Sequence, residues 1–226
     1  MYMRYALVAL LATKSYAFFP TDFREAWFGG GGISHETQTT NAFNQLAEKY
    51  FPDIREITKT MIKARSAIVD ANIAVDKDQE TAARHFDGEA FDAGQTILVD
   101  RKAEVIAALK AGDGSKARAK LGDALHGVQD FYAHSNWVEL GKTDINYDLG
   151  KKGVSLTHAG PTDRTCNDCN FGGLERIFFG CRDCEQNTAG FNLLTSGYYF
   201  GEDTPKPPAT IPDYKCHHGM RDSRPY

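Results

Sequence analysis

The sequence predicts an all-α fold followed by a loop-rich C-terminal extension. Apolar residues recur at the three- and four-residue spacing of a helix, as at Ile97, Leu98, Val105, Ile106 and Leu109. No segment shows the apolar–polar alternation of a strand. After Gly141, glycine, proline, cysteine and aspartate become frequent and the helical spacing fades. These observations favour a helical core, residues 18–141, with a cysteine-rich extension, residues 142–226, packed on it.

Four helices are expected in the core. They cover residues 37–50, with Ser34 as N-cap, residues 54–70, residues 91–110, and a last helix from an N-cap at Ser115 to about His134. Residues 76–84 are polar and are expected to form a loop.

Length and charge limit the classes of function. The 226 residues suit one domain, or one domain with an appendage, and the 42% of apolar residues suffice for an ordinary core. The net charge of −4 shows no basic surplus, so duplex nucleic acid is not an expected partner.

The N-terminus resembles an export signal. Residues 5–13 form an apolar run too short to span a bilayer, and Ser15 and Ala17 are small residues at the positions that a signal peptidase recognises. We therefore expect residues 1–17 to be a signal peptide and the mature protein to be secreted. The alternative is a buried N-terminal helix, because Lys14 lies close to the cleavage position.

Five cysteines lie in the extension. Two pairs share a CxxC spacing and one residue is left over: Cys166 with Cys169, Cys181 with Cys184, and Cys216. In an exported protein this spacing favours disulfides, whereas in a reducing compartment it favours a zinc ribbon.

The chemistry of the chain concentrates between residues 121 and 141. His126, Asp130 and His134 recur every four residues, which places all three on one stripe of a helix. Imidazole and carboxylate are zinc ligands, and a carboxylate between two imidazoles can bridge two ions. The alternative is a solvated polar stripe, which the neighbouring Phe131 and Tyr132 disfavour. Asp123 on the same helix is expected to be an exposed acid.

The segment resembles two related families. Leu121, Gly122, Ala124, His126 and Asp130 resemble the central helix of bacterial zinc-dependent phospholipase C, which is related to zinc nucleases. A closer resemblance is to Het-C proteins and the N-terminal region of secreted von Willebrand A-domain proteins, in the phrases RHFD, LGDALHGVQDFYAHSNWVELG, NLLTSGYYFG and KCHHG. It runs from about residue 33 to residue 221.

The resemblance implies a phospholipase C/nuclease-like helical domain with one to three zinc ions in a cleft. Its first ion is held by the residues that match Asp76, His85, His126 and Asp130. Asp130 would bridge to a site completed by His35, and His134 would serve another ion with His218 and Asp222. Taken separately, Asp76, His85 and His35 are more often surface or capping groups than ligands.

The chain departs from the enzymes at three points. Their N-terminal tryptophan supplies an amine ligand, whereas Trp27 is internal here. Their next histidine lies further beyond the aspartate than His134 lies beyond Asp130. Gly219 separates His218 from Asp222, which disfavours a helical ligand pair. The chain also ends where related proteins continue, so a fragment or a shortened form is one expectation.

Two functions follow from the resemblance. The first is a phospholipase C-like phosphodiesterase in which Asp76 orients or deprotonates water, with a phospholipid or another phosphodiester as substrate and peripheral membrane contact. Tyr132 and Trp137 would then line a lipid wall, although core packing is the favoured interpretation of both. The second is a non-catalytic interaction domain with a protein partner and structural or vestigial zinc. A catalytic ion needs an open coordination position, and a structural ion does not.

Overall fold

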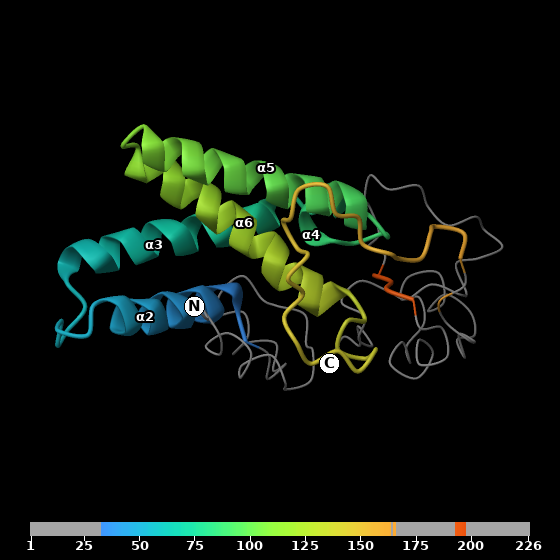
Figure 1. The fold of residues 1–226 in the computed structure, drawn as a ribbon, viewed down its shortest axis with the longest axis horizontal. Helices are drawn as coiled ribbons and strands as arrows, with labels where there is room; N and C mark the ends of the chain where they lie inside the picture. Colours follow the sequence, from blue (N-terminus) through green and yellow to red (C-terminus); the bar gives the residue numbers. More distant parts are fainter. Residues whose placement is uncertain (1–32, 164, 166–192, 198–226) are drawn as a thin grey trace.

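A computed structural model describes residues 33–163, 165 and 193–197, and these residues form a layered helical domain (Figure 1). Within those ranges there is no β-strand, only two isolated bridges, Ser135 with Ser196 and His158 with Leu194. The all-α prediction is therefore confirmed for the part of the chain that the structure describes. In the same part, no helix is long and apolar enough to cross a membrane.

The helix α6, Gly114–His134, is the central element of the domain. It packs against α3, Lys59–Ile73, on one side and α5, Phe91–Lys110, on the other. The helix α2, His35–Tyr50, covers α3 and runs antiparallel to it (Figure 1). Two short elements, η2 (Val75–Lys77) and α4 (Ala82–His85), connect α3 to α5.

Close contact between α3 and α6 depends on one glycine. A Cβ atom on Gly122 would lie 2.4 Å from the carbonyl oxygen of Ile68 and 2.6 Å from the Cβ atom of Ala71. Only a residue without a side chain lets the two backbones approach this closely. This approach brings the buried polar side chain of Asn72 on α3 to the face of α6 that carries His126.

Capping side chains explain where α2 and α3 begin. Ser34 caps α2, as predicted, through a hydrogen bond from the Thr37 amide at 3.0 Å, and the helix begins at His35, two residues earlier than expected. Thr58 caps α3 through the Met61 amide at 3.2 Å, so the predicted start at residue 54 was wrong. Residues 91–110 form a helix with the predicted bounds.

Three further predictions were wrong. Asp113, and not Ser115, caps α6 through a hydrogen bond from the Lys116 amide at 2.9 Å. The expected loop 76–84 contains part of η2 and of α4. Asp123 is not an exposed acid, because its carboxylate pairs with Arg101 at 2.8 Å and Arg84 at 3.4 Å.

The apolar core lies between α5, α6 and the irregular segment that follows α6. It consists of buried side chains from five parts of the chain: Phe86, Phe91, Leu98, Phe131, Tyr132, Leu156 and Leu194. Trp137 packs against this cluster, so the core interpretation of Tyr132 and Trp137 is confirmed. The described residues after residue 141 thus cover the same core that the helices form.

Candidate metal centre

Six of the eight predicted ligands come together in the interior of the domain. They come from the start of α2, from η2, from the end of α4 and from the last turns of α6: His35, Asp76, His85, His126, Asp130 and His134. The four histidines and Asp130 are at most 4% exposed, whereas the Asp76 side chain is 18% exposed. Their burial excludes the alternative of a solvated polar stripe.

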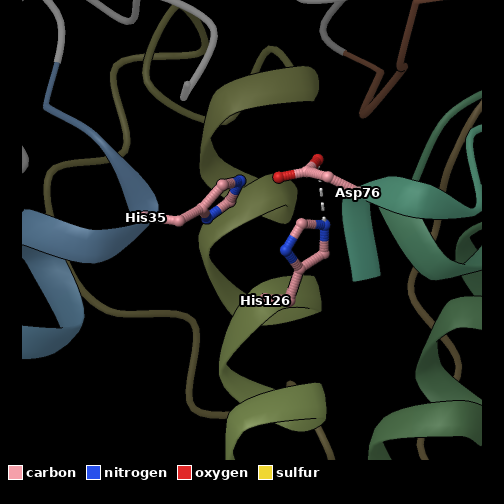
Figure 2. Close-up of side chains that lie close together, drawn as sticks. All are labelled: His35, Asp76 and His126. Carbon is pink, nitrogen blue, oxygen red and sulfur yellow. Dashed lines mark ion pairs between the residues drawn. The ribbon is translucent and has the colours of Figure 1, made fainter. Parts of the chain in front are cut away.

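Three elements converge at one side of this cluster (Figure 2). His35 on α2 and His126 on α6 stack with ring centroids 4.3 Å apart. Asp76 approaches from η2 and places its Oδ1 atom 3.8 Å from Nε2 of His126. Potential ligand atoms of these three residues all lie within 4.8 Å of one another, as do those of His85, His126 and Asp130.

Asp130 lies at the centre of the cluster. Its Oδ2 atom lies 2.8 Å from Nε2 of His126 and 2.9 Å from Nδ1 of His85. Its Oδ1 atom lies 3.3 Å from Nε2 of His35 and 3.9 Å from Nε2 of His134. The carboxylate therefore faces two histidines with each oxygen, which is the arrangement of a carboxylate that can bridge two cations.

Each histidine is held from behind by an oxygen acceptor. The outward ring nitrogens contact Gln129 Oε1 at 2.6 Å for His35, the Asp78 carbonyl at 2.7 Å for His85, Asn72 Oδ1 at 3.2 Å for His126 and the His85 carbonyl at 3.0 Å for His134. Acceptors of this kind fix the hydrogen on the outward nitrogen, and in metal sites they orient the ring toward the ion.

A polar network supports two of these acceptors. The amide group of Asn72 donates to Gln129 at 2.9 Å and to the Thr39 hydroxyl at 2.8 Å. Gln129 in turn donates to Thr39 at 3.1 Å. The hydrogen-bond directions of both amides are thus fixed, which leaves their oxygens to accept from His126 and His35.

The inward ring nitrogens favour a positive charge between them. Nε2 of His126 lies 3.1 Å from Nδ1 of His85, and both face Asp130. In neutral rings both nitrogens carry lone pairs, because the outward nitrogens hold the hydrogens. Two lone pairs this close to a carboxylate repel one another unless a proton or a metal ion lies between them.

Two buried carboxylate oxygens also favour a cation in the cluster. Oδ1 of Asp130 and Oδ2 of Asp76 are buried, and no group in the described part of the chain donates a hydrogen bond to either atom. A buried carboxylate oxygen without a donor is unfavourable, and a cation would compensate it. The donor set of imidazole nitrogens and carboxylate oxygens therefore fits a zinc ion.

The pKa values of the clustered side chains are shifted by the same charges. Burial would raise the pKa of Asp130, but the surrounding histidines, His126 foremost, hold it well below its usual range. Burial would lower the pKa values of His35 and His85, but the charge of Asp130 outweighs burial and raises both. At His126 burial dominates and its pKa is lowered. Without a metal ion, the cluster thus attracts protons to most of its rings.

His134 is held by a second carboxylate. Its Nδ1 atom lies 3.1 Å from Oδ1 of Asp87, which directs Nε2 toward Asp130. Burial would lower the pKa of His134, but the charges of Asp87 and Asp130 raise it to about 10.

The residues that lie behind the predicted ligands were not expected from the sequence. Asp87 lies two residues after His85 in the quoted phrase RHFD, and Gln129 precedes Asp130. Asn72 lies four residues after Ile68 and therefore on the same buried face of α3. A polar amide on an apolar helix face was the one feature of the sequence that could have indicated a buried polar network. The packing of α2 and α3 on α6 brings these residues behind the ligands, and no local pattern encodes it.

The remaining predicted sites lie outside the described residues. They are the ligands His218 and Asp222, the signal peptide 1–17, and Cys166, Cys169, Cys181, Cys184 and Cys216.

Comparison with known proteins supplies the family. A model of the VWA7 N-terminal domain matches residues 38–224. The chain belongs to the VWA7 N-terminal domain family. The matched range contains all the predicted ligands except His35. The resemblance to N-terminal regions of von Willebrand A-domain proteins is thereby confirmed.

Relatives are proteins described as von Willebrand factor A domain-containing protein 7. The one from Homo sapiens is 43% identical over 136 residues, which cover 60% of this chain and 14% of the relative. The one from Rattus norvegicus is 41% identical over 140 residues, with 61% and 14% covered. The chain thus spans about one seventh of the length of these VWA7 relatives. No solved structure matches the chain.

Proposed function

We propose that this VWA7 N-terminal domain binds zinc between α2, η2, α4 and α6 and hydrolyses a phosphodiester with it, as a secreted phospholipase C-like enzyme. The observation that carries the proposal is the convergence of four anchored histidines on Asp130. Each ring directs its other nitrogen toward Asp130, and among the described residues no group donates a hydrogen bond to Asp130 Oδ1 or Asp76 Oδ2. Zinc bound there would lower the pKa of water toward ~7 and polarise a phosphoryl oxygen.

The donor set allows one ion or two. The two groups of three residues within mutual reach share His126, whose inward nitrogen can serve one ion only. One ion would take His126 with Asp130 and His85. A second would take His35 and Asp76, with the other oxygen of Asp130 as bridge.

Asp76 is assigned the catalytic role. It is the most exposed member of the cluster, and its carboxylate lies beside His126. Gln79 donates to its carbonyl oxygen at 2.9 Å and so holds the backbone of η2 in place. In this position the carboxylate orients a water molecule and accepts its proton. A phospholipid or another phosphodiester would approach from this side.

Burial favours a second candidate, a non-catalytic interaction domain with structural zinc and a protein partner. The four histidines and Asp130 are at most 4% exposed, and a structural ion is closed by four protein ligands. The two functions differ at Asp76, since a structural site does not need a carboxylate at its accessible edge.

The first experiment measures zinc per chain and hydrolysis of bis(4-nitrophenyl) phosphate before and after mild chelation. An enzyme holds at least one zinc ion and loses activity on chelation. The Asp76→Asn variant should retain at least one zinc ion but lose roughly 10²–10⁴-fold in rate. Bound zinc with no hydrolysis would favour the structural function, and a chain without zinc would contradict the enzyme and favour an interaction domain whose zinc site is vestigial.

A further inference from the structure

The turn that follows α4 has a strained backbone. Phe86, Gly88 and Glu89 have φ angles of 58°, 55° and 61°, in the left-handed region. Two of these three residues carry side chains, and such conformations persist only where surrounding contacts enforce them. The turn begins after the ligand His85 and contains Asp87, which contacts His134. Its shape therefore sets the positions of two ligands.

Residues 195–197, which we call the clamp, enforce this shape. The Glu89 amide donates to the Ser196 hydroxyl at 2.9 Å, and the Ser196 amide donates to Glu89 Oε2 at 3.1 Å. The Thr195 hydroxyl donates to Glu89 Oε1, and the Gly88 amide donates to the Gly197 carbonyl at 2.7 Å. The clamp thus contacts both the backbone and the side chain of the turn.

The same clamp is bound to the end of α6. The Gly197 amide donates to the His134 carbonyl at 3.3 Å. Asn136 donates to the Thr195 carbonyl at 3.1 Å, and the Thr195 amide donates to Asn136 Oδ1 at 2.9 Å. One segment therefore joins the turn that carries His85 and Asp87 to the helix that carries His134.

Glu89 lies at the centre of these contacts. It is 5% exposed, and Thr195 and Ser196 are at most 1% exposed. Without its carboxylate, buried donors of the clamp would lose their acceptor, which is unfavourable in the interior. The sequence around Glu89 did not suggest a metal ligand. In the structure, its carboxylate and its amide bind Thr195 and Ser196 of the clamp.

We infer that Glu89 is a positioning residue of the metal centre, which orients His85 and His134 by binding the clamp. The inference rests on the proposed zinc centre but assigns Glu89 no contact with the ion. It gives the TSG part of the phrase NLLTSGYYFG a role in metal retention. Outer groups that orient ligands typically contribute 10–100-fold to metal affinity.

The test compares the full chain with Glu89→Gln, which keeps the shape of the side chain and removes its charge. Zinc affinity is measured by competition with a chromophoric chelator. We expect the affinity of Glu89→Gln to fall by about 10–100-fold. The Co²⁺-loaded variant should also show an altered visible absorption band, because the geometry of the histidine ligands changes. Unchanged affinity and an unchanged Co²⁺ spectrum would overturn the inference.

Two further variants separate positioning from general destabilisation. Glu104→Gln makes the same chemical change at a partly exposed ion pair with Arg101 and Lys120, and should keep the wild-type zinc affinity. Ser196→Ala removes a single acceptor from the clamp and serves if Glu89→Gln does not fold. It should weaken zinc binding in the same direction, and wild-type affinity in a folded Ser196→Ala would count against the clamp.

A wild-type chain that binds no zinc would refute the proposed function alone. Hydrogen exchange would then still test whether Glu89 holds the turn. In the metal-free protein, the amides of Gly88, Glu89 and Gly197 should exchange at least about tenfold faster in Glu89→Gln than in the wild type, because local opening becomes easier. Equal protection in both proteins would show that Glu89 does not hold the turn.

Discussion

At the scale of residues, the centre is organised by its outward contacts as much as by its ligands. Each histidine directs one nitrogen to an oxygen acceptor behind its ring and the other to the region around Asp130. This division of roles makes the two kinds of contact separately testable.

Asp130 is the residue whose loss should affect the centre most. Asp130→Ala removes the carboxylate that all four histidines face, so most bound zinc should be lost. The fold should lose about 3–5 kcal/mol, as when one partner of a buried charged pair is removed. Elemental analysis and thermal unfolding measure both effects, with Asp100→Ala on the exposed face of α5 as control. Wild-type zinc content and melting temperature in Asp130→Ala would refute the metal centre on α6.

Gln129 tests the outward contacts. Gln129→Met keeps the length of the side chain but cannot accept from His35, which now lies 2.6 Å from the amide oxygen. Zinc affinity should fall about 10–100-fold while at least one ion still binds at saturation. Competition with a chelator provides the measurement, and Gln45→Met on the same helix as His35 is the matched control. Equal affinities in the two variants would show that the contact does not orient the ring.

At the scale of elements, local signals predicted the helices better than their ends. The apolar stripe of α5 and the Ala111–Gly112 break after it are local features, and both bounds were predicted correctly. The predicted start of α3 was wrong because Ile54 fits the apolar spacing of the helix. The structure shows that the helix begins only after its N-cap, Thr58. The i, i+4 stripe of α6 predicted three ligands, since helical spacing alone aligns them.

The N-cap of α6 is a case where two candidates can be compared directly. Asp113→Ala should destabilise the domain by about 1 kcal/mol, because the Lys116 amide loses its acceptor. Ser115→Ala, at the exposed position predicted as the cap, should change stability by less than about 0.5 kcal/mol. Urea unfolding of both variants measures the difference. A larger effect at Ser115 would mean that the cap is misassigned.

The contact of α3 with α6 is tested at Gly122. Gly122→Ala would place a methyl group 2.4 Å from the Ile68 carbonyl, so the helices must separate. We expect a loss of about 1–3 kcal/mol in the free energy of unfolding, typical of overpacking. Gly114→Ala is the control, because the nearest atom to its new Cβ, at 3.1 Å, belongs to the flexible side chain of Arg118. A Gly122→Ala variant as stable as Gly114→Ala would contradict this packing.

At the scale of the whole molecule, the site depends on contacts that the sequence pattern does not encode. Asp76, His85 and His35 carried no signal of their own, and only the resemblance joined them to the stripe on α6. The fold joins them by stacking α2 and α3 against α6 (Figure 1). Asn72 and Glu89 were not predicted for the same reason, since their partners are 54 and 107 residues away in the chain.

Metal removal should loosen the domain without unfolding it. The apolar cluster around Phe131 contains none of the ligands, so the chelated protein should keep its far-ultraviolet helical signal. Free zinc at 100 times its dissociation constant should restore about 2.7 kcal/mol of stability. Circular dichroism and thermal unfolding, with and without chelator, measure this. Loss of the helical signal on chelation at 25 °C would instead show that the metal is required for folding.

The left-handed backbone at Phe86 restricts which amino acids evolution or design can place there. Glycine would adopt a φ of 58° without strain, a relief of about 1–2 kcal/mol. It would also remove a ring that is 1% exposed and lies 5.5 Å, centroid to centroid, from Phe131, and emptying such a position costs about 3–5 kcal/mol. Because the loss exceeds the relief, position 86 should resist the replacement that its backbone favours. Variant libraries at this position should therefore retain large aromatic residues and be depleted of glycine.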